Sequence, residues 1–170
     1  MIPVLHGARV SLRGFTWADF APFSAMWQEP EVAKHIPFAP VPVTQSWSRF
    51  NGNSYRWASG GFGNWAVVDK AGTFLGTTGF FIRDEKAHEP VFESGWVFAA
   101  AAQGQGYGSE AVKLAHDWFD AQAFGGHSTC MMGPDHGASI RVAQKVGYSG
   151  AVVETDAWGP VQTMERHRPV

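Results

Sequence analysis

The stretch that decides the fold runs from residue 92 to residue 119 and reads FESGWVF-AAAA-QGQGYG-SEAVKLAHDWF. Its first part, 92–98, is rich in aromatic and β-branched residues, which is typical of a strand. Its last part, 109–119, carries apolar residues at three- and four-residue steps, which indicates one face of an amphipathic helix. Between the two parts, Gly104, Gly106 and Gly108 recur at alternate positions. The sequence therefore predicts a strand, a glycine loop and a helix in direct succession.

A glycine loop in front of a helix is suited to binding an anion. Glycines let successive backbone N–H groups turn toward one point, and the helix N-terminus adds partial positive charge. The even glycine spacing excludes the dinucleotide fingerprint Gly-x-Gly-x-x-Gly, and no Gly-Lys-Ser/Thr ending is present to make a Walker loop. The alternative is a purely steric role, because helix starts often carry glycine for packing reasons alone.

The remaining pattern is Gln-x-x-Gly-x-Gly, formed by Gln103, Gly106 and Gly108. It resembles the loop that binds the pyrophosphate of acyl-coenzyme A in the GNAT N-acetyltransferase superfamily. The flanking residues, Glu-Ser-Gly-Trp-Val-Phe before the loop and Ser-Glu-Ala after it, look like the branch that contains the RimJ and RimL ribosomal-protein N-acetyltransferases. The resemblance implies a single GNAT domain over residues 1–170. Its fold would be α/β (α+β), with a central mixed, mostly antiparallel sheet of about 6–7 strands flanked by helices.

A second signature covers residues 134–148, PDHGASIRVAQKVGY. It resembles the family's Pro-Glu-Asn-x-x-Ser-x-x-x-x-x-Lys-x-Gly-Phe segment, and two such matches in the expected order are more specific than either alone. The family's Asn, which usually contacts the pantetheine arm, falls on His136. The tyrosine general acid of many GNAT enzymes falls on Ala143. In the RimJ/RimL-like branch a serine interacts with the coenzyme sulfur, and its position here is Ser139; a helix-start hydroxyl that bonds the backbone is the alternative.

Acetyl transfer to an amine needs a neutral amine, a place for the oxyanion and a way to stabilise the leaving thiolate. Glu93 is polar among apolar neighbours on the predicted strand, which makes it our candidate to accept the proton of the amine, directly or through water. The alternative is an ordinary solvent-facing strand residue. The resemblance assigns coenzyme binding to Trp96, Val97, Phe98, Gln103, Gly104, Gln105, Gly106, Tyr107, Gly108, Ser109, His136 and Ser139.

Composition limits the other possibilities. A chain of 170 residues favours one domain with one core. The net charge is −2 without a basic run, which argues against direct nucleic-acid binding. The single cysteine, Cys130, cannot form an internal disulfide, and no leader pattern or membrane-length apolar run occurs, so we expect a cytoplasmic protein. The histidines show no metal-ligand spacing, and no metal is predicted.

The rest of the chain predicts helices inserted into a mixed sheet. We expect a strand within residues 2–13, followed by helices over 16–29, 29–35 and 44–55. A hairpin follows, with Gly76 and Gly79 marking a bulge or a close backbone approach in its second strand. The remaining expectations are a polar connection at 83–90, a helix stop at Gly125-Gly126, a strand at 128–132, a helix from 134 closed by Gly147, and strands at 151–153 and 162–166.

The sequence thus predicts an N-acetyltransferase that uses acetyl-coenzyme A and acts by direct attack of an amine in a ternary complex. Two rivals stay open, a non-catalytic acyl-coenzyme A binding or sensing module, and an anion-binding fold without coenzyme. The acceptor, a protein N-terminus or a small-molecule amine, cannot be read from the sequence because specificity lies in loops. No membrane partner is expected, and homodimerisation is left open.

Overall fold

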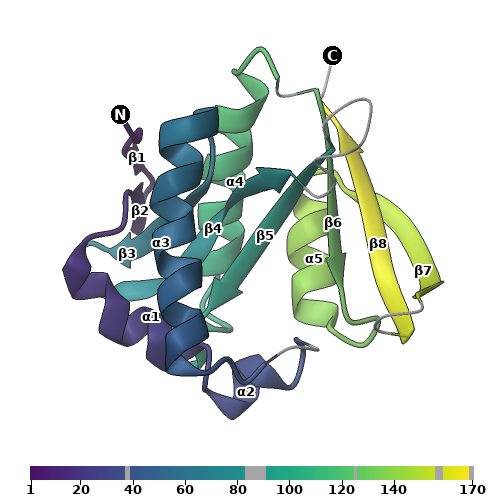
Figure 1. Ribbon diagram of the computed structural model, residues 1–170. Coiled ribbons are helices and arrows are strands. Elements are labelled where there is room, and N and C mark those ends of the chain that lie inside the picture. Colours follow the sequence, from purple (N-terminus) through teal and green to yellow (C-terminus); the bar gives the residue numbers. More distant parts are fainter. Residues whose placement is uncertain (37–38, 83–90, 125, 156–158, 169–170) are drawn as a thin grey trace.

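A single eight-stranded sheet forms the centre of the computed structural model (Figure 1). The structure describes residues 1–36, 39–82, 91–124, 126–155 and 159–168. The strand order is β1-β2-β3-β4-β5-β6-β8-β7, and every neighbouring pair is antiparallel except β5 and β6. The strands are β1 Leu5–His6, β2 Val10–Arg13, β3 Asn64–Asp69, β4 Phe74–Ile82, β5 Phe92–Phe98, β6 His127–Met132, β7 Ser149–Thr155 and β8 Gly159–His167. The expected mixed, mostly antiparallel sheet is confirmed.

Helices cover both faces of this sheet (Figure 1). One face carries α1 and α3, and the other carries α4 and α5. The helices are η1 Trp17–Asp19, α1 Phe20–Met26, α2 Pro30–Ala33, α3 Val43–Gly60, η2 Ala100–Ala102, α4 Tyr107–Asp120 and α5 Gly137–Lys145. The connection expected at 83–90 lies outside the described residues.

The first predicted strand is in fact two. The chain turns at Gly7, whose N–H donates to the carbonyl of Val10, and β1 and β2 form an antiparallel hairpin with Leu5 opposite Leu12. Polar and apolar residues alternate through both arms, so the alternation alone did not reveal the turn. The hairpin brings the residues between its arms beside α4, where they contact the glycine loop.

The helix start predicted at Thr16 is confirmed. The carboxylate of Asp19 accepts hydrogen bonds from the backbone N–H and the hydroxyl of Thr16, at 2.7 and 2.9 Å. It also accepts hydrogen bonds from both terminal guanidinium nitrogens of Arg13, at 2.6 and 2.9 Å. Burial alone would raise the pKa of Asp19, but these donors lower it below its ordinary value.

The strands β3, β4 and β5 form an antiparallel meander that delivers the chain to the glycine loop. Gly76 and Gly79 are sites of close backbone approach, as expected, because a Cβ on Gly76 would collide with the carbonyl of Val97 and one on Gly79 with that of Gly63. The register also shifts between Val67 and Val68. The meander places β5 in the sheet between the two helical layers.

The predicted stop of the central helix at Gly125-Gly126 is wrong. The helix α4 ends at Asp120, and Gly125 lies outside the described residues. The carboxylate of Asp120 pairs with Arg166 through two bonds of 2.7 and 2.6 Å, and its carbonyl accepts from Arg168 at 2.7 Å. These arginines on and beyond β8 satisfy the helix end, which no local signal predicts.

A buried polar chain ties α4 to the start of β7. The ring of His116 lies between the carbonyl of Val112, 2.7 Å from Nδ1, and the hydroxyl of Tyr148, 3.0 Å from Nε2. A carbonyl only accepts, so Nδ1 carries the proton and Nε2 accepts from Tyr148. The hydroxyl of Ser128, 2.7 Å away, then donates to Tyr148. The network therefore requires a neutral His116.

The protein should lose stability as the pH falls from about 6.5 to about 4. Burial lowers the pKa of His116 from 6.5 to about 4. Between these pH values His116 is protonated in the unfolded chain but neutral in the folded chain. The free energy of unfolding therefore falls by up to roughly 1.4 kcal/mol for each unit of the pKa shift. Urea unfolding midpoints at pH 7 and pH 5 measure the loss. His116→Gln, which cannot titrate, should show a smaller drop than the wild type; equal drops would contradict the assignment.

Candidate active site

The strands β5 and β6 separate after a short shared segment. They pair in parallel only at Phe92 with Ser128 and Glu93 with Thr129, and then diverge, with α5 behind the opening (Figure 1). Beyond Glu93, the backbone groups of β5 that face β6 have no partner on that strand in the described ladder. The family resemblance predicts such an open strand edge at Trp96, Val97 and Phe98.

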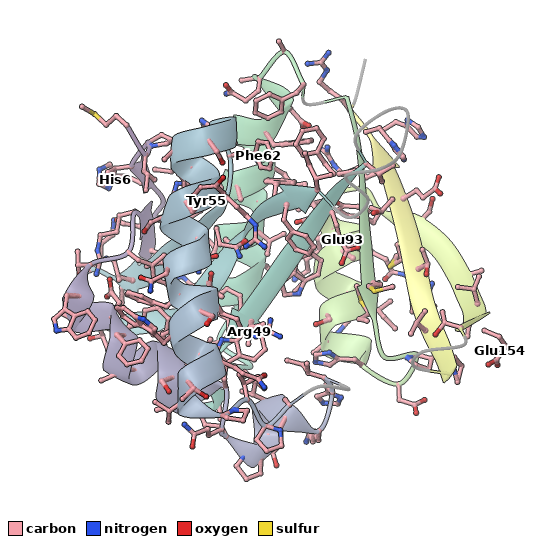
Figure 2. The ribbon with its side chains drawn as sticks, viewed as in Figure 1. His6, Arg49, Tyr55, Phe62, Glu93 and Glu154 are labelled. Atoms are coloured by element: carbon pink, nitrogen blue, oxygen red, sulfur yellow. The ribbon has the colours of Figure 1, made fainter. Side chains whose placement is uncertain are left out.

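Glu93 occupies the last shared rung, where the two strands part (Figure 2). Its side chain is buried, 8% exposed, which excludes the solvent-facing alternative. The preceding Phe92 packs on Phe119 of α4, and successive strand residues point to opposite faces, so Glu93 points to the face that α1 and α3 cover. Its cross-strand neighbour there is Phe81.

The glycine loop has the backbone conformation that its glycines allow. Gly104 and Gly106 adopt φ values of +73° and +82°, in the left-handed region that residues with a Cβ rarely occupy. Gly106 is the N-cap of α4, and Gly108 lies in the first turn, where an added Cβ would stand 3.3 Å from the ring of Phe98. The first N–H groups of a helix lack intrahelical acceptors, so the turn presents donors to an anion.

Gln103 and Gln105 hold the loop through their side chains. The amide of Gln103 donates to the carbonyl of Phe98 at 2.9 Å, and that of Gln105 donates to the carbonyl of Ala101 at 2.6 Å. Ser109, in the first turn of α4, accepts a hydrogen bond from Lys145 of α5 at 3.2 Å. The two predicted signatures therefore meet, because the lysine of one contacts the serine of the other.

Arg9 is a site residue that sequence reasoning missed. Its guanidinium donates to the carbonyl of Gln105 at 2.8 Å, pairs with Glu110 at 3.1 Å and lies 4.9 Å from the ring centroid of Tyr107. Burial would raise the pKa of Glu110, but hydrogen bonds from the backbone of Arg9 and Val10 and from the Arg9 side chain lower it overall. The N-terminal hairpin therefore braces the loop with a cation.

The start of α5 lies across the opening from β5. Ser139 Oγ accepts from Trp96 Nε1 at 3.3 Å, so the serine faces the open strand. His136, the N-cap of α5, stacks on His35, which follows the C-cap of α2, with ring centroids 3.8 Å apart and an angle of 5° between the rings. Burial, with smaller contributions from the charges of His35 and Lys34, lowers the pKa of His136 to about 4. A neutral imidazole can donate one hydrogen bond and accept another, as the family's amide does.

Position 143 carries an alanine, so no tyrosine general acid is present there. Ala143 is fully buried in the cluster around Cys130, Tyr148 and Met164. Burial raises the pKa of the Cys130 thiol well above its ordinary value. Cys130 is therefore a core residue, and its thiol is not suited to act as a nucleophile.

A pocket of about 360 Å³ opens on the other side of the sheet, between α1, α3 and β3. Its side chains are apolar, amide, hydroxyl and cationic, and Arg49 and Arg56 supply the charge. The pocket lies on the face to which Glu93 points. Its lining residues are Phe23, Gln45, Ser48, Arg49, Gly52, Asn53, Arg56 and Asn64.

One cluster of possible metal ligands occurs among the described residues. Donor atoms of His127, Glu165 and His167 lie within 4.8 Å of one another on β6 and β8. Spacing along the sequence cannot reveal it, because His127 and His167 meet through antiparallel pairing. Glu165 and His167 are exposed, and the cluster stands beside the start of β5, at the opposite end from the glycine loop. It takes no part in the site described above.

No described helix is long and apolar enough to cross a membrane.

Comparison with known proteins agrees with this geometry. Residues 9–149 match the model of the family described as "Acetyltransferase (GNAT) domain". An uncharacterised protein of Bacillus subtilis, YkkB, is 30% identical over 143 residues, which are 82% of this chain and 81% of that protein.

Solved structures share the fold. An acetyltransferase from Agrobacterium tumefaciens superposes with a TM-score of 0.82 at 22% identity, covering 98% of this chain and 95% of the other. RimL, a ribosomal-protein alpha-N acetyltransferase in complex with coenzyme A, superposes with a TM-score of 0.80 at 13% identity, covering 97% and 98%. The chain therefore belongs to the GNAT family of acetyltransferases, whose acetyl donor is acetyl-coenzyme A.

Proposed function

We propose that this enzyme transfers the acetyl group of acetyl-coenzyme A to a primary amine by direct attack within a ternary complex. The observation that carries the proposal is the location of Glu93. A buried carboxylate stands where β5 and β6 part, on the face of the sheet that also carries the pocket under α3. A donor held on one side of the sheet and an amine held on the other would meet at this point.

The coenzyme would be held mainly by backbone groups. The N–H groups at the start of α4 and in the glycine loop suit a pyrophosphate, and the open edge at Trp96, Val97 and Phe98 suits the pantetheine arm. His136, neutral and at a helix start beside this edge, could replace the usual amide. The fit depends on the left-handed Gly104 and Gly106, which let the backbone approach a ligand closely.

Acetyl-coenzyme A supplies a thioester, whose carbonyl carbon takes the amine's lone pair and whose thiolate leaves as the C–S bond breaks. Glu93 would take the proton that the amine loses, directly or through one water. A backbone amide on the open edge of β5 would donate to the carbonyl oxygen as negative charge develops there. Ser139 would donate a hydrogen bond to the departing sulfur, and the free thiolate would then take a proton from solvent water. Ala143 leaves no tyrosine for that role.

Ser139→Ala should lower kcat roughly tenfold, the scale of a hydrogen bond to a charged group, and should raise KM for acetyl-coenzyme A much less. A hydroxyl that helps the thiolate leave is needed only as charge develops on sulfur. Steady-state kinetics measure the split. Ser59→Ala, which removes an exposed hydroxyl from α3, is the control. If Ser139→Ala kept the wild-type kcat, the serine would have no role in the departure of the thiolate and would only accept a hydrogen bond from Trp96.

Two measurements test the proposal as a whole. Acetyl-coenzyme A at about a hundredfold over Kd should stabilise the protein by about 2.7 kcal/mol, which a generic anion-binding fold would not show. Thiol release across a panel of amines then separates an enzyme from a sensor. Stabilisation without turnover of any amine would favour the non-catalytic acyl-coenzyme A binding module.

We also retain two expectations about the protein's surroundings. Cys130 is a free, buried thiol, which is consistent with a cytoplasmic location. The acceptor is expected to be an amine, either on a small molecule or at a protein N-terminus.

A further inference from the structure

The pocket under α3 carries two positive charges. Arg49 and Arg56 lie two helical turns apart on α3, and both side chains line the cavity. The described residues that line it include no carboxylate. They include three amides, Gln45, Asn53 and Asn64. The cavity therefore offers several hydrogen-bond donors and a positive potential.

Both guanidinium groups rest on aromatic rings, one at the end of α1 and one on β4. Arg49 Cζ lies 5.3 Å from the ring centroid of Trp27, and Arg56 Cζ lies 5.9 Å from that of Phe81. Figure 2 shows Arg49 reaching from α3 toward β5, whereas Tyr55 stands on the outer side of the helix and is 73% exposed. The two cations are therefore held at the inner side of α3.

The two charges are close enough to repel each other. Burial lowers the pKa of Arg49 below its ordinary value, and the charge of Arg56 lowers it further. Arg56 has no ion-pair partner among the described residues. An anion bound between these two like charges would reduce their mutual repulsion.

The cationic pocket adjoins the proposed base. Phe81, beneath Arg56, is directly opposite Glu93 on the neighbouring strand. Residues paired in this way point to the same face, with Cβ atoms about 5 Å apart. One short molecule could therefore present an amine to Glu93 and a negative group to the arginines.

We propose that the acceptor is a small amine that also carries a carboxylate or phosphate group, which Arg49 and Arg56 bind under α3. The inference rests on the proposed N-acetyltransferase function and names its substrate class. A planar guanidinium binds either anion through two parallel hydrogen bonds. The cavity of about 360 Å³ lies within the range for small-molecule sites, about 300 to 1,000 Å³, so its volume suits a small ligand.

The first test compares amines in pairs that differ in the anionic group. O-phosphoethanolamine is paired with ethanolamine, and tyrosine with tyramine; a neutral tripeptide represents peptide N-termini. In the wild type, kcat/KM should be higher for the anionic member than for the neutral member of at least one pair. The pair with the larger ratio shows whether the site prefers a phosphate or a carboxylate. Preference for the neutral members or for the tripeptide would overturn the inference.

The second test uses variants, so that the intrinsic reactivity of each amine cancels. Arg56→Gln should lower kcat/KM for the preferred anionic amine about 10- to 100-fold and leave its neutral partner within a few-fold. Arg56→Lys keeps the charge but loses the planar guanidinium. Its kcat/KM for the anionic amine should lie between those of the wild type and Arg56→Gln. Lys113→Gln removes a charge from the exposed side of α4 and should change neither rate. Equal losses for both members in Arg56→Gln would overturn the inference, and unchanged melting temperatures exclude misfolding as the cause.

A binding measurement separates this inference from the proposed function. Calorimetry with coenzyme A present needs no turnover, and O-phosphoethanolamine or tyrosine should bind to the wild type and more weakly to Arg56→Gln. Binding that depends on Arg56 in a protein that acetylates no amine would uphold the anion site and reject the acetyltransferase proposal. Acetylation that shows no preference for anionic amines, together with binding that does not depend on Arg56, would uphold the acetyltransferase proposal and reject the anion site.

Discussion

Gly106→Ala is expected to weaken binding of acetyl-coenzyme A about 10- to 100-fold while the protein stays folded. Gly106 has a φ of +82°, and an L residue in the left-handed region costs roughly 1–2 kcal/mol. Its Cβ would also stand 3.1 Å from Arg9 Nη2, so the arginine that braces the loop must shift. The loop could then no longer direct its N–H groups at one point. Gly108→Ala should also weaken binding, because its Cβ would meet the ring of Phe98 and obstruct the approach of a pyrophosphate.

Gly72→Ala is the matched control for backbone strain. Gly72 has a φ of +86° in the turn between β3 and β4, and nothing lies within 4 Å of an added Cβ. It should lose similar stability but keep full coenzyme affinity. Calorimetric titration with coenzyme A and thermal unfolding measure the two effects separately. Unchanged affinity in both Gly106→Ala and Gly108→Ala would remove the anion-binding role from the loop.

Glu93→Gln is expected to lower kcat/KM about 100-fold, the usual scale for a positioned base. Gln has nearly the same shape, so the buried site should keep its packing, but it cannot take a proton. The loss should be largest at low pH, where most of the amine is protonated, and should shrink as free amine accumulates at high pH. Rates of thiol release from pH 6 to pH 9, at a fixed total concentration of amine, give the profile.

Glu154→Gln is the control for this change. Glu154 is an exposed carboxylate on β7, far from the site in Figure 2, and its loss should leave the pH profile unchanged. A Glu93→Gln variant with the wild-type rate and profile would assign the deprotonation to bulk water or to another group. Melting temperatures of both variants exclude a loss of fold as the cause of any lower rate.

The sequence predicted the strand, glycine loop and helix of residues 92–120 with good accuracy because each depends on local physics. Left-handed φ values at Gly104 and Gly106 require glycine, and the apolar period of the helix is set by its own geometry. The family signatures added the mixed, mostly antiparallel sheet and the acetyl donor, but not the order of the strands. Local signals failed where a boundary depends on distant residues, as at Asp120, whose partner Arg166 comes 46 residues later.

What the sequence by itself determined is therefore the family and the mixed sheet flanked by helices; the residues that bind the coenzyme stay a prediction of the sequence. Only the tertiary structure joined Arg9 to the glycine loop, set Glu93 at the last rung shared by β5 and β6, and gathered Arg49 and Arg56 into a pocket on the same face as Glu93. These arrangements depend on strand register and on the packing of α3 against the sheet. Both are decided by the summed burial of the whole chain, and no short stretch of residues encodes them.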